Sequence, residues 1–156
     1  MENMDCLSQK IELRFSLGLN KKISKQLTST SNYKLLADIE GVFQISIYDQ
    51  LFFDDPYILL FELGLELSKW RKKTEYEDSV DFSYKTMDYD DEAILLFKKC
   101  MDRNNWKISS IWQLFESNEE IEHELLMNAV DNFLHELEIQ LFEFYNINFK
   151  DYLDNV

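Results

Sequence analysis

The sequence has little of what several protein classes require. It contains three glycines, one proline, two cysteines and two histidines in 156 residues. The three glycines are isolated, which excludes a glycine-rich phosphate-binding loop. Cys6 and Cys100 lie far apart, so the chain is expected to be reduced and to lack a disulfide framework. Low glycine and proline with 46% hydrophobic residues argues against disorder except at the termini.

Basic residues are also scarce. The chain has 16 Lys and Arg against 30 Asp and Glu, a net charge of −14 at pH 7. This balance argues against nucleic acid as a direct ligand, because such binding relies on cations that neutralise phosphates. The longest apolar run, Tyr57 to Phe61, ends at Glu62 and is too short to cross a bilayer. The N-terminus has no apolar segment typical of a secretory signal. We therefore expect a cytoplasmic protein with no membrane partner.

Period-two alternation of apolar and polar residues predicts several half-buried strands. The first is the run from Ile11 to Leu19, and the second contains Phe43, Ile45 and Ile47, with Gly41 marking a bulge or tight turn. The remaining candidates are a strand over 80–86 and a hairpin of 93–101 with 106–115, joined by Asp102-Arg103-Asn104-Asn105. Asp and Asn suit such a turn because they tolerate left-handed backbone geometry.

Two main helices are predicted between and after these strands. The first has Asp55 as N-cap and Pro56 at its first position, and it ends in a basic last turn. The second begins with a capping box of Ser117 and Glu120 and runs to about Tyr145. Its apolar stripe consists of Leu126, Val130, Phe133, Leu137, Leu141 and Phe144. A final short turn folds Phe149, Tyr152 and Leu153 back. The predicted fold is a single α+β domain over residues 1–156, with an antiparallel sheet of about five strands packed against two main helices.

No catalytic or metal motif is complete. His123-Glu124 and His135-Glu136 each begin like HExxH, but Met127 and Ile139 occupy the position of the second histidine. Glu120 and His123 have the spacing of a di-iron half-site, and such sites need a second copy. A nucleophilic pair of Cys100 with a histidine is the weaker interpretation, because a free cysteine on a strand is more often a small buried residue. We expect a non-enzymatic protein without metal or cofactor.

Acidic residues are concentrated in two segments. Residues 116–146 hold nine acids and no Lys or Arg, and residues 74–92 hold eight acids, three tyrosines and only Lys85 as a base. An acidic surface attracts basic proteins, and tyrosine supplies rigid contact area. The alternative for the second segment is a solvated acidic loop. The candidate partner-binding residues are Glu75, Tyr76, Glu77, Asp78, Asp88, Tyr89, Asp90, Asp91 and Glu92, with Glu120, Glu124, Asp131 and Glu138 on the last helix.

Part of the chain resembles known proteins. The residues concerned are Phe52-Phe53-Asp54-Asp55-Pro56, Glu62-Leu63, Trp70, Asp81-Phe82-Ser83-Tyr84 and the run from Trp106 to Gln113. Over about 51–113 the chain resembles small uncharacterised bacterial proteins and the immunity proteins of polymorphic or contact-dependent toxin systems. The resemblance implies a small acidic cytosolic domain that binds a cognate basic toxin domain, often a nuclease, and occludes its active site. It implies no catalytic residues.

Two other functions stay open. One is a phage-encoded inhibitor that mimics nucleic acid to block a host defence system. The neighbouring genes would distinguish this function from that of an immunity protein. The other is an enzyme with a carboxylate or metal site, for which tightly held zinc or iron would revive the pair Glu120 and His123. The sequence does not indicate the strand order, the oligomeric state or which acidic surface makes the contact.

Overall fold

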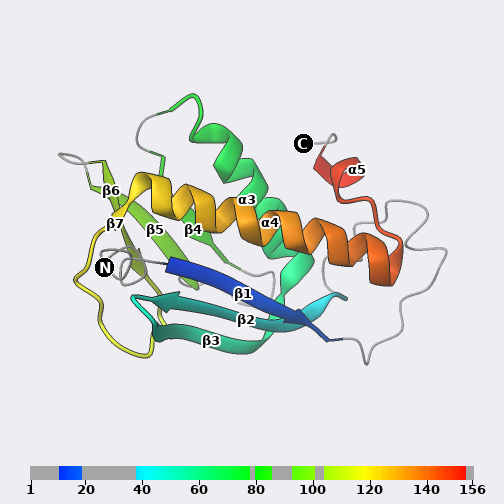
Figure 1. Cartoon of the computed structure of the whole chain (residues 1–156), viewed down its shortest axis with the longest axis horizontal. Coiled ribbons are helices and arrows are strands. Elements are labelled where there is room, and N and C mark those ends of the chain that lie inside the picture. Colours follow the sequence, from blue (N-terminus) through cyan, green and yellow to red (C-terminus); the bar gives the residue numbers. More distant parts are fainter. Residues whose placement is uncertain (1–10, 19–37, 78–79, 86–92, 101–103, 154–156) are drawn as a thin grey trace, which may run out of the picture.

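A computed structural model shows seven strands and three helices in the part of the chain that it describes (Figure 1). The structure describes residues 11–18, 38–77, 80–85, 93–100 and 104–153. The strands in this part are β1 (Ile11–Leu17), β2 (Glu40–Ile47), β3 (Gln50–Leu59), β4 (Phe82–Tyr84), β5 (Leu95–Cys100), β6 (Asn105–Ser109) and β7 (Ile121–Glu122). The helices are α3 (Leu60–Lys73), α4 (His123–Tyr145) and α5 (Phe149–Leu153).

The strands form two antiparallel sheets, so the expectation of one sheet of about five strands was wrong in detail. One sheet has three strands in the order β1-β2-β3, and the other has four in the order β4-β5-β6-β7. The α+β class is confirmed. Periodicity indicates which residues form a strand, but pairing depends on contacts distant in sequence, and for that reason the division into two sheets was missed.

The first sheet follows the predicted alternation. In β1 the side chains of Ile11, Leu13 and Leu17 are buried, and β1 pairs along its length with β2. The register between β2 and β3 shifts next to Gly41, which confirms the predicted bulge. A Cβ on Gly41 would collide with the carbonyl oxygen of Ser16. Glycine is therefore required here because two backbones approach closely.

The predicted helix start at Asp55 and Pro56 was wrong. These residues lie inside β3, which continues to Leu59, and α3 begins at Leu60. The Asp55 carboxylate accepts a hydrogen bond from the Tyr57 backbone nitrogen at 2.8 Å, so it bonds to the backbone within β3 and does not cap a helix. Proline has no N–H to donate to a neighbouring strand. Pro56 is tolerated because β3 lies at the edge of its sheet and Pro56 has no partner in the register with β2.

The second sheet contains the predicted hairpin in a shorter form. Strands β5 and β6 are antiparallel neighbours, and the connecting residues 101–103 lie outside the described part. The expected strand to Phe115 ends at Ser109. The chain then turns, with the Trp112 nitrogen donating to the Ser110 hydroxyl at 3.0 Å, and the Leu114 nitrogen donates to the Phe52 carbonyl of β3 at 2.8 Å.

The predicted capping box does not start α4. Residues 121–122 pair with β6 as β7, and α4 begins at His123. The Ser117 hydroxyl accepts from the Glu119 nitrogen at 3.3 Å, before the helix. The predicted end is confirmed, because α4 runs to Tyr145 and Asn146 adopts a left-handed conformation (φ 56°). The predicted final turn is α5.

A single cluster of buried side chains includes residues of both sheets and of all three helices. Helix α4 crosses in front of α3 and packs on β1 (Figure 1). At the crossing of the two helices, a Cβ on Gly64 would collide with Leu137. The aromatic ring of Trp70 contacts the rings of Phe97 and Trp106, which joins α3 to the second sheet. No helix in the described ranges is long and apolar enough to cross a membrane.

Candidate functional site

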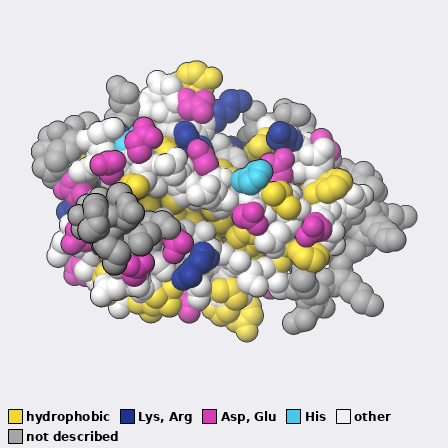
Figure 2. Space-filling model, in the orientation of Figure 1, with side chains coloured by type: hydrophobic (Ala, Val, Ile, Leu, Met, Phe, Trp, Pro, Cys, Tyr) yellow, Lys and Arg dark blue, Asp and Glu magenta, His cyan; other side chains and the backbone are white. Residues whose placement is uncertain are grey.

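The predicted acidic residues of α4 lie along one line of its outer surface. Glu124, Asp131 and Glu138 are spaced seven residues apart, which returns to nearly the same helix face. Glu124 and Asp131 are exposed and Glu138 is partly exposed. On the visible face of the molecule, acidic side chains are spread over several elements rather than collected in a single patch (Figure 2).

Two of these acids face cations of the same chain. The Arg71 guanidinium donates to both carboxylate oxygens of Asp131, at 2.9 and 3.0 Å, and so ties α3 to α4. The Lys150 ammonium lies 4.0 Å from Glu138. Arg71 also lies 3.9 Å from Glu75. Part of the predicted negative charge is therefore already compensated within the fold.

The C-terminal half of α4 carries exposed apolar side chains among its acids. Ile139 is 42% exposed and Phe142 is 60% exposed. Both lie in a shallow hollow of about 670 Å³, called here the α4 groove, which is lined by His135, Glu138, Ile139, Phe142, Glu143 and Lys150. Hydrophobic and acidic side chains lie next to one another over this half of the helix (Figure 2).

Phe144 does not lie in the α4 groove, although it is also exposed. The sequence placed it in the buried stripe with Leu137 and Leu141, and those two residues are fully buried. Phe144 is 50% exposed, so that part of the prediction was wrong.

The acidic segment after α3 is described only in part. Glu75, Tyr76 and Glu77 are exposed, and Tyr76 is 78% exposed. Asp78, Asp88, Tyr89, Asp90, Asp91 and Glu92 lie outside the described residues. Tyr84, the third tyrosine of this segment, is fully buried and donates to the Glu62 carboxylate at 2.9 Å. Burial, followed by the charge of Glu62, raises the pKa of Tyr84 far above its usual value.

Glu120 and His123 are both engaged by neighbouring side chains. The Asn105 amide donates to Glu120 at 3.1 Å, and the Trp106 indole donates to Nδ1 of His123 at 3.1 Å. Burial is the main cause that lowers the pKa of His123, and the positive charge of Lys99 adds to it. Within the described ranges, no group of three or more His, Cys, Asp or Glu residues is arranged to hold a metal ion.

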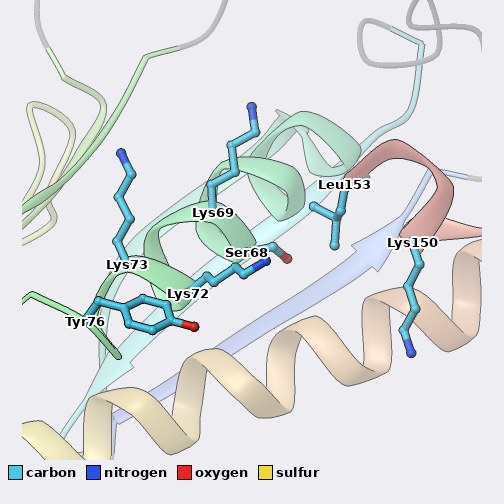
Figure 3. A pocket seen from close by; sticks show the side chains of 7 residues that line it. All are labelled: Ser68, Lys69, Lys72, Lys73, Tyr76, Lys150 and Leu153. Carbon is cyan, nitrogen blue, oxygen red and sulfur yellow. The ribbon is translucent and has the colours of Figure 1, made fainter. Parts of the chain in front are cut away.

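A second hollow, of about 650 Å³, lies between α3 and α5 (Figure 3). We call it the lysine pocket, and its lining residues are Ser68, Lys69, Lys72, Lys73, Tyr76, Lys150 and Leu153. Tyr76, predicted to contact a partner from an acidic segment, thus lines a hollow together with four lysines. Lys150 lines both the lysine pocket and the α4 groove, so the two hollows adjoin.

Sequence reasoning missed the apolar part of the α4 groove and the whole lysine pocket. A signal for the first existed, because Ile139 and Phe142 fall outside the spacing of the buried stripe and lie on the acidic face. The pocket had no local signal, because Lys72 and Lys150 are far apart in the sequence and line one hollow only because α5 packs on α3.

Comparison with known proteins places most of the chain in one family. Residues 14–143 match the family described as Domain of unknown function (DUF7878), and the chain belongs to that family. No curated protein and no solved structure matches the chain.

Proposed function

We propose that this protein is a non-enzymatic immunity protein, which binds a cognate basic toxin domain through the α4 groove and occludes the active site of that domain. The observation that carries the proposal is the exposure of Ile139 and Phe142 on a regular helix, inside a hollow bordered by Glu138 and Glu143. Exposed apolar side chains rimmed by charged residues are typical of protein interaction sites.

The groove is suited to anchor a partner. Phe142 carries a large rigid ring, and burying such a ring in a partner's pocket supplies much of the affinity of a protein interface. The helix that holds it is fixed from the other side by the fully buried Leu137 and Leu141. The anchor therefore loses little conformational freedom on binding, which favours affinity.

The surrounding carboxylates select the charge of the partner. Among the described residues, Glu136 and Glu143 form no ion pair, so both are available to lysines and arginines of a partner. The net charge of −14 adds long-range attraction. Such attraction mainly raises the association rate, and salt screens it. The active-site surface of a nuclease is basic because it binds phosphates, so its charge is complementary to the negative charge of this protein.

A protein partner explains the groove better than mimicry of nucleic acid does. Mimicry relies on carboxylates that replace phosphates, yet Asp131 is held by Arg71 and Glu138 lies near Lys150. Mimicry also gives no role to Ile139 and Phe142. A docking surface uses both the apolar side chains and the acids around them.

The test is binding to the protein encoded immediately upstream of this gene, produced as a purified domain. We expect that domain to be basic, to be toxic when expressed alone, and to be neutralised by coexpression. Phe142→Ser should weaken binding about 30-fold or more, because a buried aromatic anchor contributes about 2 kcal/mol or more. Calorimetry and growth measure the two effects.

The matched control is Tyr57→Ser, which removes another exposed aromatic ring, 74% exposed against 60% for Phe142, from β3, distant in sequence from the groove. This variant should bind and protect like the wild type. Equal losses in both variants, or a neighbouring product that neither binds nor kills, would contradict the proposed function.

A further inference from the structure

The lysine pocket concentrates positive charge in an otherwise acidic protein. Four of the 16 basic residues line this one hollow, and none of its lining residues is acidic. Three of the lysines come from the C-terminal half of α3, and Lys150 comes from α5. The local charge is thus opposite to that of the whole chain.

The side chains of the pocket have different orientations. Ser68, Lys72 and Tyr76 are spaced four residues apart, which places them on one side of α3 and its continuation. Figure 3 shows the Lys72 side chain extending along α3 toward Ser68, with the Tyr76 ring beside it. From α5, Leu153 points toward the same hollow, whereas Lys150 points toward α4. Lys69 and Lys73 point away from α4 and border the same hollow.

Internal ion pairs account for only part of this charge. Lys69 lies 3.4 Å from Glu66, and Lys150 lies 4.0 Å from Glu138. Both pairs are solvent-exposed, and exposed pairs are weak enough for a ligand to replace. Lys72 and Lys73 form no ion pair with any described residue.

The helix dipole gives a structural reason for some of these lysines. Cations in the last turn of a helix stabilise it by about 0.3–1 kcal/mol, and Lys72 and Lys73 occupy that turn of α3. The dipole does not explain Lys150, which lies on another helix, or the Tyr76 ring next to Lys72 (Figure 3). A ligand that uses both charge and ring accounts for the complete lining.

We propose that the lysine pocket binds a phosphate monoester that carries a flat ring, of the chemical class of a mononucleotide. The Lys72 ammonium and the Ser68 hydroxyl, which neighbour each other on α3, hold the phosphate, and Lys150 adds positive charge from α5. The exposed Tyr76 ring stacks on the flat ring of the ligand, and Leu153 contacts its apolar edge. The volume of about 650 Å³ is in the range of small-molecule sites.

This inference does not depend on the proposed function. Binding of a small anion can be measured without any partner protein, and Ile139 and Phe142 do not line the lysine pocket. Failure of one proposal therefore leaves the other in place.

The experiment is calorimetric titration of the full chain with adenosine monophosphate, adenosine and inorganic phosphate. An ionic strength of about 0.15 M is suitable, because the Debye length of about 8 Å then screens the distant acids more than the adjacent lysines. We expect saturable, submillimolar binding of adenosine monophosphate, weaker binding of phosphate and none of adenosine. Tyr76→Ala should weaken only the binding of the nucleotide.

The charge is tested by a pair of matched double variants. Lys72→Gln with Lys150→Gln should weaken nucleotide binding about tenfold or more, the effect of losing a charge-assisted hydrogen bond. Lys98→Gln with Lys107→Gln makes the same change of net charge at two exposed lysines that face each other on β5 and β6, and binding should persist. No saturable binding, equal losses in both double variants, or equal affinity for phosphate and nucleotide would overturn the proposal.

Discussion

Helix α4 has apolar side chains on two opposite faces, and only one of these faces is covered. On the inner face Leu137 and Leu141 are fully buried against the core. On the outer face Ile139 and Phe142 are 42% and 60% exposed, within the same turns of the helix. The inner residues contribute to folding because they leave water when the chain folds. The outer residues gain little from folding.

This difference separates the requirements of the fold from those of a function. A single exposed apolar residue needs no explanation. Two that share one hollow with Glu138 and Glu143 form a surface whose composition suits a partner. The inner face should therefore control stability, whereas the outer face should control binding.

The largest expected effect comes from a matched pair of truncations on the two faces. Leu137→Ala should lower the free energy of unfolding by about 2–5 kcal/mol, because it leaves a cavity beside Gly64 in the core. Phe142→Ala should change it by about 0.5 kcal/mol or less, as is usual for exposed positions. Urea denaturation of both variants measures the difference. Similar losses in the two variants would show that the outer face is part of the core.

The next largest effect on stability is expected at Tyr84, which contacts an acidic residue, Glu62, that contributes to the fold. Its hydroxyl donates to Glu62 at 2.9 Å inside the protein. Tyr84→Phe removes a hydrogen bond to a carboxylate and should cost about 1–3 kcal/mol in unfolding free energy. Substitutions of the exposed Glu136 and Glu143 should cost much less, since these acids form no ion pair among the described residues.

The pH dependence tests the same contact. The pKa of Tyr84 is raised in the folded protein, mainly by burial, from a usual value of 10.0. Above about pH 10 the unfolded chain releases this proton and the folded protein keeps it, so stability falls by up to about 1.4 kcal/mol per pH unit. Tyr84→Phe should show a shallower decline. Burial also raises the pKa of Tyr48 and Tyr145. Both residues are present in the wild type and in Tyr84→Phe, so their contribution cancels in the comparison. Equal slopes in denaturation series from about pH 8 to 11 would contradict this reasoning.

Local patterns predicted the elements that local interactions determine. The alternation in β1 and the stripe containing Leu126, Phe133 and Leu137 follow from burial of one face, which repeats along the sequence. The start at Asp55 and Pro56 was mispredicted because a capping carboxylate and a proline also fit an exposed edge strand. There the pairing of β2 with β3 outweighed the local signal.

The candidate site was predictable only where a single helix contains it. Glu138 was found as part of an acidic face, and Phe142 was available from the same helical spacing. The ion pair of Arg71 with Asp131 joins residues on two helices, and no periodicity indicates such a pair. For the same reason the compensation of charge on the outer face, and the lysine pocket next to it, appeared only in three dimensions.

The smallest expected effect concerns Asp131, which lies on the outer face but binds a residue of α3. Its bidentate contact with Arg71 is partly exposed to solvent, with side-chain exposures of 24% for Arg71 and 48% for Asp131. Asp131→Asn should therefore lower the free energy of unfolding by only about 0.2–1 kcal/mol. The loss should shrink in about 1 M NaCl, where the Debye length is about 3 Å.

Glu136→Gln is the control for this variant, because it removes one negative charge from the same helix without breaking an ion pair among the described residues. It should leave stability unchanged or slightly raise it by relieving repulsion among the acids. If Asp131→Asn behaves like Glu136→Gln in urea denaturation at low salt, Asp131 belongs with the acids that face a partner. If Asp131→Asn destabilises the protein and Glu136→Gln does not, the charge of Asp131 contributes to the stability of the fold, although this residue lies on the outer face.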